Sequence, residues 1–211
     1  MIEAMLATAI PLFPLQNVVL FPGVFLPLHI FENRYRTMLR DVLAGDRMIF
    51  IVLQKPGWNE DAGGRAATYA VGCSGLVTHV EQLEDGRYNI ILRGVEKFRI
   101  NAEEDGKPYR IAQVSPLAEY MSNADHDAVR GQRQRLEQLL ASAHTPDLPF
   151  PDTLSDEEVV NALAQYLEFD AVERQALLER PGVAARCSAL VDLLEMKSMA
   201  PAYAPDRGLM H

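Results

Sequence analysis

The chain has 211 residues, enough for one domain or two small ones around a hydrophobic core. Hydrophobic residues make up 48% and charged residues 23%, as in soluble globular proteins, and no apolar run approaches the roughly 18 residues of a membrane helix. The net charge is −9, and residues 121–211 hold 8 Lys/Arg against 15 Asp/Glu. This balance disfavours a nucleic-acid-binding protein, which needs clustered basic side chains for phosphates.

The first segment, MIEAMLATAIPLF, carries an early acid and no basic region, so it does not look like a secretory signal. We therefore expect a cytoplasmic protein. Residues 10–43 then combine a dense apolar content with prolines at 11, 14, 22 and 27, which predicts bent strands around a turn at Pro22-Gly23. From Tyr35 the apolar residues follow helical spacing, and Gly45 is the expected end of that helix.

Strand-like segments follow this helix. Glu84-Asp85-Gly86 is a hairpin turn signal between two of them. The predicted strands are residues 47–53, 69–83, 87–92, 97–100 and 109–117. Residues 8–118 are therefore predicted to form a β-rich unit with a single early helix.

Beyond residue 118 the pattern is helical. The first helix is expected at residues 125–143, with leucines and a valine on one side, and the last at residues 183–199. Between them, Ser155 with Glu158 and Asp170 with Glu173 have the spacing of capping boxes at two helix starts. We predict a helical subdomain over residues 119–199 and a flexible tail over 200–211, and thus an α+β protein.

The string FPLQNVVLFPGVFLPLHIFENRYRTML, residues 13–39, resembles the opening of the substrate-binding N-terminal domain of the Lon protease family. In the helical half, QALLERPGVAARCSALVDLLEMK, residues 175–197, is similar to a leucine-rich helical segment of the same family. The resemblance implies a PUA-like β pseudo-barrel followed by a C-terminal helical bundle. It also implies a domain that binds polypeptide substrates.

A complete Lon protease would need an ATPase and a Ser-Lys peptidase. The sequence has no G-x-x-x-x-G-K-[ST] string, and none of its four lysines lies in a serine context like the peptidase dyad. Residues 72–76, GCSGL, fail the G-x-S-x-G pattern of a nucleophile elbow. Cys73 and Cys187 are expected to be buried free thiols. We therefore predict a stand-alone recognition domain, not an enzyme, lacking the ATPase and peptidase domains.

No metal or other cofactor is predicted. Zinc requires three or four ligands at known spacings, and the chain has neither C-x-x-C nor H-E-x-x-H. The short pairs His29/Glu32 and His79/Glu81 are better explained as strand and helix-start residues.

Three aromatic residues are the candidate peptide contacts. Phe21 and Phe25 flank the Pro-Gly turn, and Trp58 lies in a glycine-rich acidic loop, although all three can also serve as core. We predict a non-catalytic module that recognises unfolded or extended polypeptide through an apolar groove or an exposed strand edge. Two alternatives remain open: an adaptor that binds a folded protein through its acidic helical half, and a small-molecule hydrolase with an unrecognised nucleophile or metal.

Overall fold

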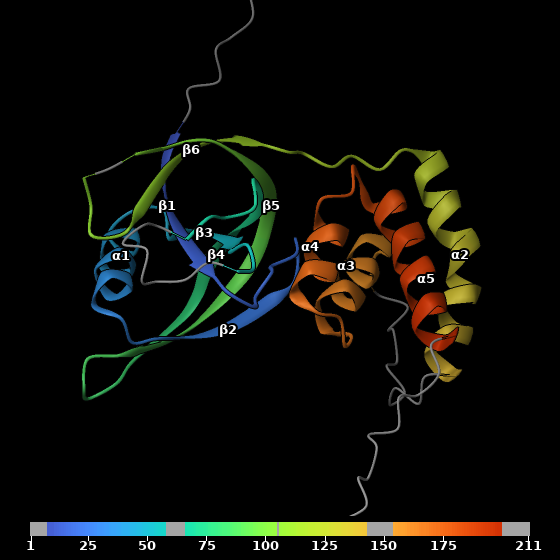
Figure 1. Ribbon diagram of the computed structural model, residues 1–211, viewed down its shortest axis with the longest axis horizontal. Coiled ribbons are helices and arrows are strands. Elements are labelled where there is room, and N and C mark those ends of the chain that lie inside the picture. Colours follow the sequence, from blue (N-terminus) through green and yellow to red (C-terminus); the bar gives the residue numbers. More distant parts are fainter. Residues whose placement is uncertain (1–7, 58–65, 105, 143–153, 200–211) are drawn as a thin grey trace, which may run out of the picture.

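The computed structural model describes residues 8–57, 66–104, 106–142 and 154–199 (Figure 1). Within these ranges the N-terminal half holds six strands and one helix, and the C-terminal half holds four helices. The elements in chain order are β1 Thr8–Leu15, β2 Phe25–Ile30, α1 Asn33–Leu43, β3 Met48–Leu53, β4 Val71–Gln82, β5 Tyr88–Glu104, β6 Arg110–Pro116, α2 Asn123–Ser142, α3 Asp156–Tyr166, α4 Ala171–Leu178 and α5 Val183–Met199. The described part contains no helix long and apolar enough to cross a membrane.

The strands form one sheet in the order β2-β5-β4-β3-β1-β6, and an additional pairing of β5 with β6 closes it. β1 runs parallel to β3, and the other pairs are antiparallel. Closure depends on the 17-residue length of β5, whose first part pairs with β2 and whose last part pairs with β6. The predicted α+β fold, a PUA-like pseudo-barrel with one early helix followed by helices, is confirmed.

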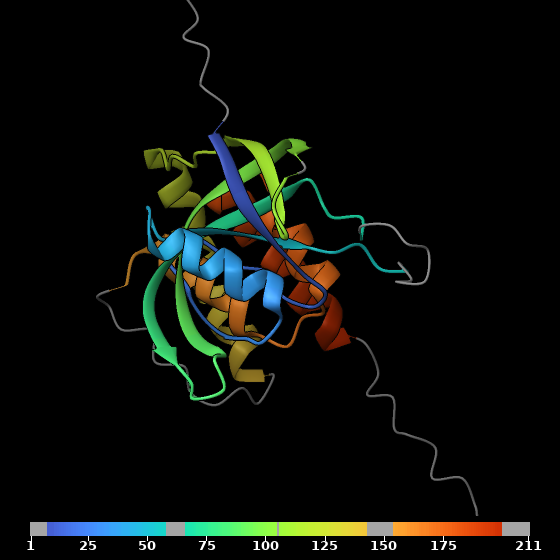
Figure 2. The same cartoon turned by 90° about the vertical axis from the view of Figure 1, so that its left-hand side faces the viewer.

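Helix α1 covers one side of the barrel (Figure 2). Its buried residues are Tyr35, Met38, Leu39 and Val42, the helical spacing read from the sequence. They join barrel side chains such as Phe13 and Ile49 in one apolar cluster. The outer side of α1 is fixed through Asp41 Oδ2, which accepts a 2.6 Å hydrogen bond from the Tyr109 hydroxyl and lies 2.9 Å from Lys107 Nζ.

The sequence predicts two strands at residues 87–92 and 97–100, but β5 is continuous through both. The linking residues keep hydrogen-bond partners outside a regular ladder. Gly94 N donates to the Val24 carbonyl at 2.8 Å, and the Ser74 hydroxyl bridges the amide and the carbonyl of Glu96. Both predicted capping boxes, at the starts of α3 and α4, are confirmed.

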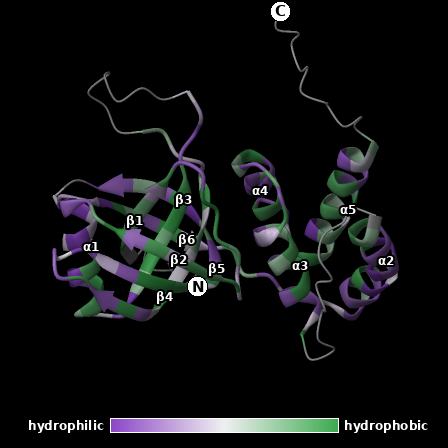
Figure 3. Cartoon of the chain, turned by 90° about the horizontal axis from the view of Figure 1, so that it is seen from below, coloured by the Kyte–Doolittle hydropathy of each residue, from purple (hydrophilic) through white to green (hydrophobic). Residues whose placement is uncertain are grey.

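The helical half packs against the barrel through a shared core. In the largest apolar cluster, barrel-side residues such as Val19, Phe21 and Leu53 join buried residues of all four helices. Among the helices of this half, Figure 3 shows more hydrophobic residues on α3, α4 and α5, whereas α2 is largely hydrophilic. Cys73 and Cys187 are both buried free thiols, as the sequence predicts. The limits 8–118 and 119–199 remain our proposed division, with residue 118 in the segment that links β6 to α2.

Candidate functional site

A window in the barrel wall marks the junction of the two halves. The pairing of β5 with β2 ends at Arg93, and its pairing with β6 begins at Phe98. Between them, residues 94–97 border no described strand on that edge. The turn at Pro22-Gly23 and the start of the β6–α2 connector fill the gap, because Gly23 N donates to Gly94 O at 2.9 Å and Leu117 N donates to Lys97 O at 2.8 Å.

Two glycines make this close approach possible. Gly23 has a φ of +78°, a left-handed conformation that other residues rarely adopt. A Cβ added to Gly94 would lie 2.0 Å from the carbonyl oxygen of Phe21. The turn can therefore lie directly on β5 only because Gly94 has no side chain.

Two adjoining hollows of about 390 and 320 Å³ form what we call the junction groove. Both are lined by Pro22, Val95 and Glu157, so they adjoin at these residues. The helical side of the groove is the start of α3, and the connector supplies Tyr120. Val95 is 49% exposed and Tyr120 is 89% exposed, which leaves apolar surface open to a ligand.

A buried charge cluster lies next to the groove. Glu119, on the connector, accepts from Lys97 of β5 at 2.6 Å and from Arg186 of α5 at 2.7 and 2.9 Å. Arg186 also donates to Asn161 of α3 at 2.6 Å, and its guanidinium lies 5.7 Å from the centre of the Phe21 ring. Burial lowers the pKa of Lys97, an effect that its hydrogen bond and ion pair with Glu119 oppose. The cluster thus joins the barrel, the connector and two helices.

The outer side of β2, β5 and β4, which we call the sheet face, extends away from the groove. Residues directly opposed on antiparallel strands point to the same side of a sheet, so their side chains form rows. The three rows are Phe25–Arg93–Leu76, Pro27–Ile91–His79 and His29–Asn89–Glu81. Arg93 and Leu76 also line the junction groove, so the sheet face and the groove adjoin.

The far end of the sheet face is a shallow hollow of about 470 Å³ with a polar border. Asn89 links the other two members of its row: its Oδ1 lies 2.8 Å from His29 Nδ1, and its Nδ2 donates to Glu81 at 2.8 Å. No group of three His, Cys, Asp or Glu side chains in the described ranges is placed to hold a metal ion. Of the two His/Glu pairs in the sequence, His29 and Glu81 contact Asn89, and Glu32 accepts from Arg34 at 2.8 Å.

The structure separates the three predicted contact residues. Phe25 is 50% exposed on the sheet face beside the groove. Phe21 is completely buried in the shared core, so its side chain cannot reach a ligand at the surface. Trp58 lies outside the described residues. The prediction for Phe25 therefore has an accessible surface to support it, whereas Phe21 supports the site only from beneath.

Sequence reasoning missed Val95, Tyr120 and Glu157. Their types are unremarkable, and they come from a strand, a connector and a helix that are far apart in the chain. A lone exposed tyrosine in a connector was the only available signal. The groove is a product of how the halves dock.

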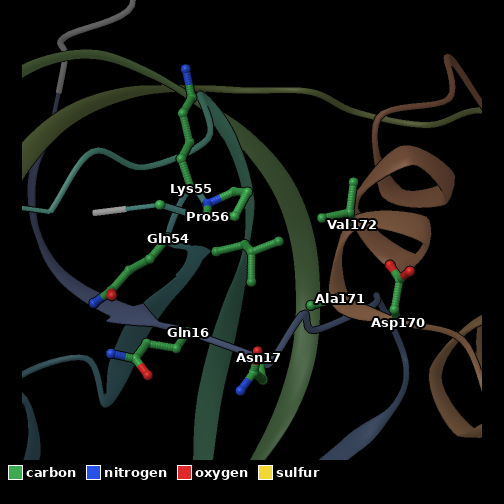
Figure 4. Close-up of a pocket in the computed structure, with 10 residues that line it drawn as sticks. Gln16, Asn17, Gln54, Lys55, Pro56, Asp170, Ala171 and Val172 are labelled. Carbon is green, nitrogen blue, oxygen red and sulfur yellow. The ribbon is translucent and has the colours of Figure 1, made fainter. Parts of the chain in front are cut away.

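A second cleft, of about 380 Å³, lies where α4 faces the barrel (Figure 4). Its barrel side carries Gln16, Asn17, Gln54 and Lys55, and its helix side carries residues 170–172. The Asp170 carboxylate already accepts a 2.8 Å hydrogen bond from the amide of Glu173 as the helix cap. Half of the residues that line this cleft are polar, and its carboxylate already accepts a hydrogen bond, so the cleft suits an apolar segment less well than the sheet face.

Residues 72–76 do not form a reactive site. Burial raises the pKa of the Cys73 thiol to about 12, which makes its nucleophilic thiolate scarce. The Ser74 hydroxyl is buried and bonded to the backbone of Glu96. Cys73 thus packs in the barrel core, and Ser74 links β4 to β5 beside the gap in the barrel wall.

Comparisons with known proteins agree with this architecture. Residues 9–196 match the family described as the ATP-dependent protease La (LON) substrate-binding domain. Lon protease 2 of Myxococcus xanthus is 26% identical over 196 residues, covering 89% of this chain and 24% of that protein. Lon protease 2 of Syntrophobacter fumaroxidans is 30% identical over 173 residues, covering 80% of this chain and 22% of that protein. The chain thus spans about a quarter of the length of the curated relatives it matches.

Two solved structures share the fold. The N-terminal domain of a Mycobacterium avium complex Lon protease superposes with a TM-score of 0.68 at 16% identity, covering 89% of this chain and 98% of that one. A Lon N-terminal domain protein from Xanthomonas campestris has a TM-score of 0.60 at 22% identity, covering 92% and 99%. At these identities the likeness establishes the fold.

Proposed function

This chain belongs to the family of ATP-dependent protease La (LON) substrate-binding domains, and from that premise we propose that it binds unfolded or extended polypeptide segments without catalysing a reaction. The sequence carries no P-loop string and no serine-lysine context like the peptidase dyad. The described Cys73 and Ser74 side chains are buried and engaged in packing. The proposed role is recognition.

The observation that carries the proposal is the exposed apolar surface around Phe25. Half of this side chain is open to solvent, and Pro27, Ile91 and Leu76 lie in the same or the adjoining row of the sheet face. The junction groove continues this surface past Val95. An extended segment that crosses the rows can place alternate apolar side chains on them.

Side-chain contacts, more than strand addition, are expected to provide the affinity. β2 pairs with β5 alone among the described strands, so its other edge has no strand partner, which is the condition for strand addition. However, the Tyr166 hydroxyl donates to the Phe25 carbonyl at 2.9 Å, and Pro27 has no amide proton. A peptide added at this edge would therefore lose main-chain hydrogen bonds at two positions. We favour the sheet face, with weak affinity per segment because the bound chain must be ordered.

The test is fluorescence anisotropy of a labelled, permanently unfolded model protein titrated with the intact chain. Phe25→Ala is expected to weaken binding about fivefold or more, since a large aromatic contact is lost. Met196→Ala is the control, because Met196 is also an exposed apolar side chain, at 69% against 50% for Phe25, but lies on α5 and not on the sheet face. Trp58→Ala tests the remaining predicted contact in the same assay.

Equal binding by wild type and Phe25→Ala would remove the sheet-face assignment, and no saturable binding would remove the proposed function. Phe21→Ala is unsuitable as a probe. Truncating a fully buried phenylalanine to alanine costs about 3–5 kcal/mol of stability, so a loss of binding would be explained by unfolding alone.

The second candidate function is an adaptor that binds a folded, basic partner through the acidic helical half. Residues 121–211 carry 15 acidic against 8 basic side chains, and α2 is largely hydrophilic in Figure 3. Charge-driven association weakens as salt rises, whereas apolar contacts persist. Binding in the anisotropy assay that disappears at high salt, and that Phe25→Ala leaves unchanged, would favour the adaptor.

A further inference from the structure

We propose that the junction groove binds a lysine or arginine side chain of the bound polypeptide beside Glu157, with a neighbouring apolar residue packed on Val95 and Tyr120. This inference rests on the proposed function and specifies its substrate class: extended segments in which a basic residue lies close to an apolar one. It also assigns the groove a role separate from that of the sheet face.

The first support is the position of Glu157. It lies in the first turn of α3 and is a lining residue of both hollows of the groove. Within the described ranges no hydrogen bond or ion pair reaches its carboxylate. Burial, followed by the charge of Glu119, raises the pKa of Glu157 above the usual glutamate range. A partly buried carboxylate without a counterion is stabilised by an added cation.

The buried cations near the groove are already engaged. The ammonium group of Lys97 has three protons, and it has three partners: Glu119 at 2.6 Å and the carbonyls of Leu178 and Arg180 at 2.9 and 2.7 Å. Arg186 donates to both oxygens of Glu119, to Asn161 and to the Leu177 carbonyl. Among these hydrogen bonds, neither Lys97 nor Arg186 donates one to Glu157.

The exposed cation of the groove is Arg93, and it acts on a different acid. Its charge contributes to the lowered pKa of Glu158, after the larger effect of the capping hydrogen bonds from Ser155. The charges that act on Glu157 are those of Glu119, Arg186 and Glu158. Glu119 has the strongest effect of the three and Glu158 adds to it, so together they outweigh Arg186 and favour a cation from outside.

The groove also has the shape that such a side chain requires. A lysine or arginine has a long apolar stem, which packs on apolar surface while its charged end remains near water or a carboxylate. Val95 and Tyr120 provide that surface in the hollow that Glu157 also lines, at 49% and 89% exposure. Because Val95 is two residues from Arg93 on β5, a segment lying on the sheet face can extend into the groove.

The test uses three labelled peptides that share one unstructured apolar sequence and differ at a single central position, Lys, Gln or Glu. Anisotropy titrations at moderate salt are expected to show the Lys peptide binding roughly three- to tenfold more tightly than the Gln peptide, with the Glu peptide weakest. Glu157→Gln should remove the Lys preference while the Gln peptide still binds. Glu84→Gln, the same charge change in the exposed β4–β5 turn, should keep the preference.

Equal affinity of wild type for the Lys and Gln peptides would overturn this inference while leaving the proposed function intact. A Lys preference that survives in Glu157→Gln, or that Glu84→Gln removes equally, would also overturn it, because general electrostatics would then be the cause. No binding of any of the three peptides would overturn both. Phe25→Ala separates the two proposals further: it should weaken all three peptides in parallel.

Discussion

Neutralising Glu119 should destabilise the contact between the barrel and the helices. Its carboxylate is the acceptor shared by Lys97 and Arg186, and the three side chains have relative exposures of 9, 4 and 0%. Glu119→Gln keeps one acceptor oxygen but leaves two buried cations without a counter-charge. Removing one partner of a buried ion pair costs about 3–5 kcal/mol. This is a large part of the free energy of unfolding of a typical domain, which is about 5–15 kcal/mol.

The assay is urea unfolding followed by circular dichroism at 222 nm. With a urea dependence of about 2 kcal/mol per molar, a loss of about 4 kcal/mol lowers the unfolding midpoint by about 2 M. Hydrogen exchange of β5 and α5 amides should show faster opening in both halves, since the cluster joins them. Glu96→Gln is the matched control, because the exposed Glu96 side chain leaves the cluster intact, and its effect should stay within about 0.5 kcal/mol.

A loss of less than about 1 kcal/mol in Glu119→Gln would refute this reasoning, because it would mean that water or rearrangement compensates the cations readily. Faster exchange confined to α5, with β5 unaffected, would show that the halves are held together by the apolar core alone.

Three further predictions concern the backbone, the thiols and pH. Gly94→Ala should destabilise the protein by about 3 kcal/mol, because the added Cβ would clash with the carbonyl oxygen of Phe21. Gly131→Ala in α2 should instead stabilise it by about 0.5–1 kcal/mol, because the added Cβ would meet no atom outside its own helix within 4 Å. Thermal melts compare the two variants with wild type. Cys73 and Cys187, whose pKa values burial raises to about 12 and 11, should react with a thiol reagent only after denaturation, and rapid native-state labelling would contradict their burial. Hydrogen bonds from the Tyr109 hydroxyl and from Lys107 lower the pKa of Asp41. The stabilising effect of Asp41 should therefore be present above the ordinary aspartate pKa and lost as the pH falls through the lower folded-state value. The free energies of unfolding of wild type and Asp41→Asn, measured across that range, should converge at acid pH.

Much of the architecture could be predicted because its causes are local. Helix starts depend on residues three apart, so Ser155 with Glu158 and Asp170 with Glu173 predict capping boxes that the structure contains. The helical spacing from Tyr35 likewise names the buried face of α1. The continuity of β5 was missed because Gly94 and Glu96 find partners on a turn and on the Ser74 hydroxyl, which no local pattern shows.

The candidate site shows where sequence reasoning ends. Phe21 and Phe25 flank the same Pro-Gly turn and have the same chemistry, so composition cannot separate them. The turn, with Gly23 in a left-handed conformation, directs Phe21 into the core and leaves Phe25 half exposed. Only the chain path in three dimensions decides which of them a ligand can reach.

The sequence by itself determined the order of the elements, their caps and the family, because each depends on residues near one another in the chain. The tertiary structure decided the surface. Pro22, Val95 and Glu157 meet in one groove because the helical half docks on a window in the barrel wall. That docking depends on a shared apolar core and a buried ion cluster assembled from distant segments, and such contacts leave no spacing for a sequence pattern to reveal.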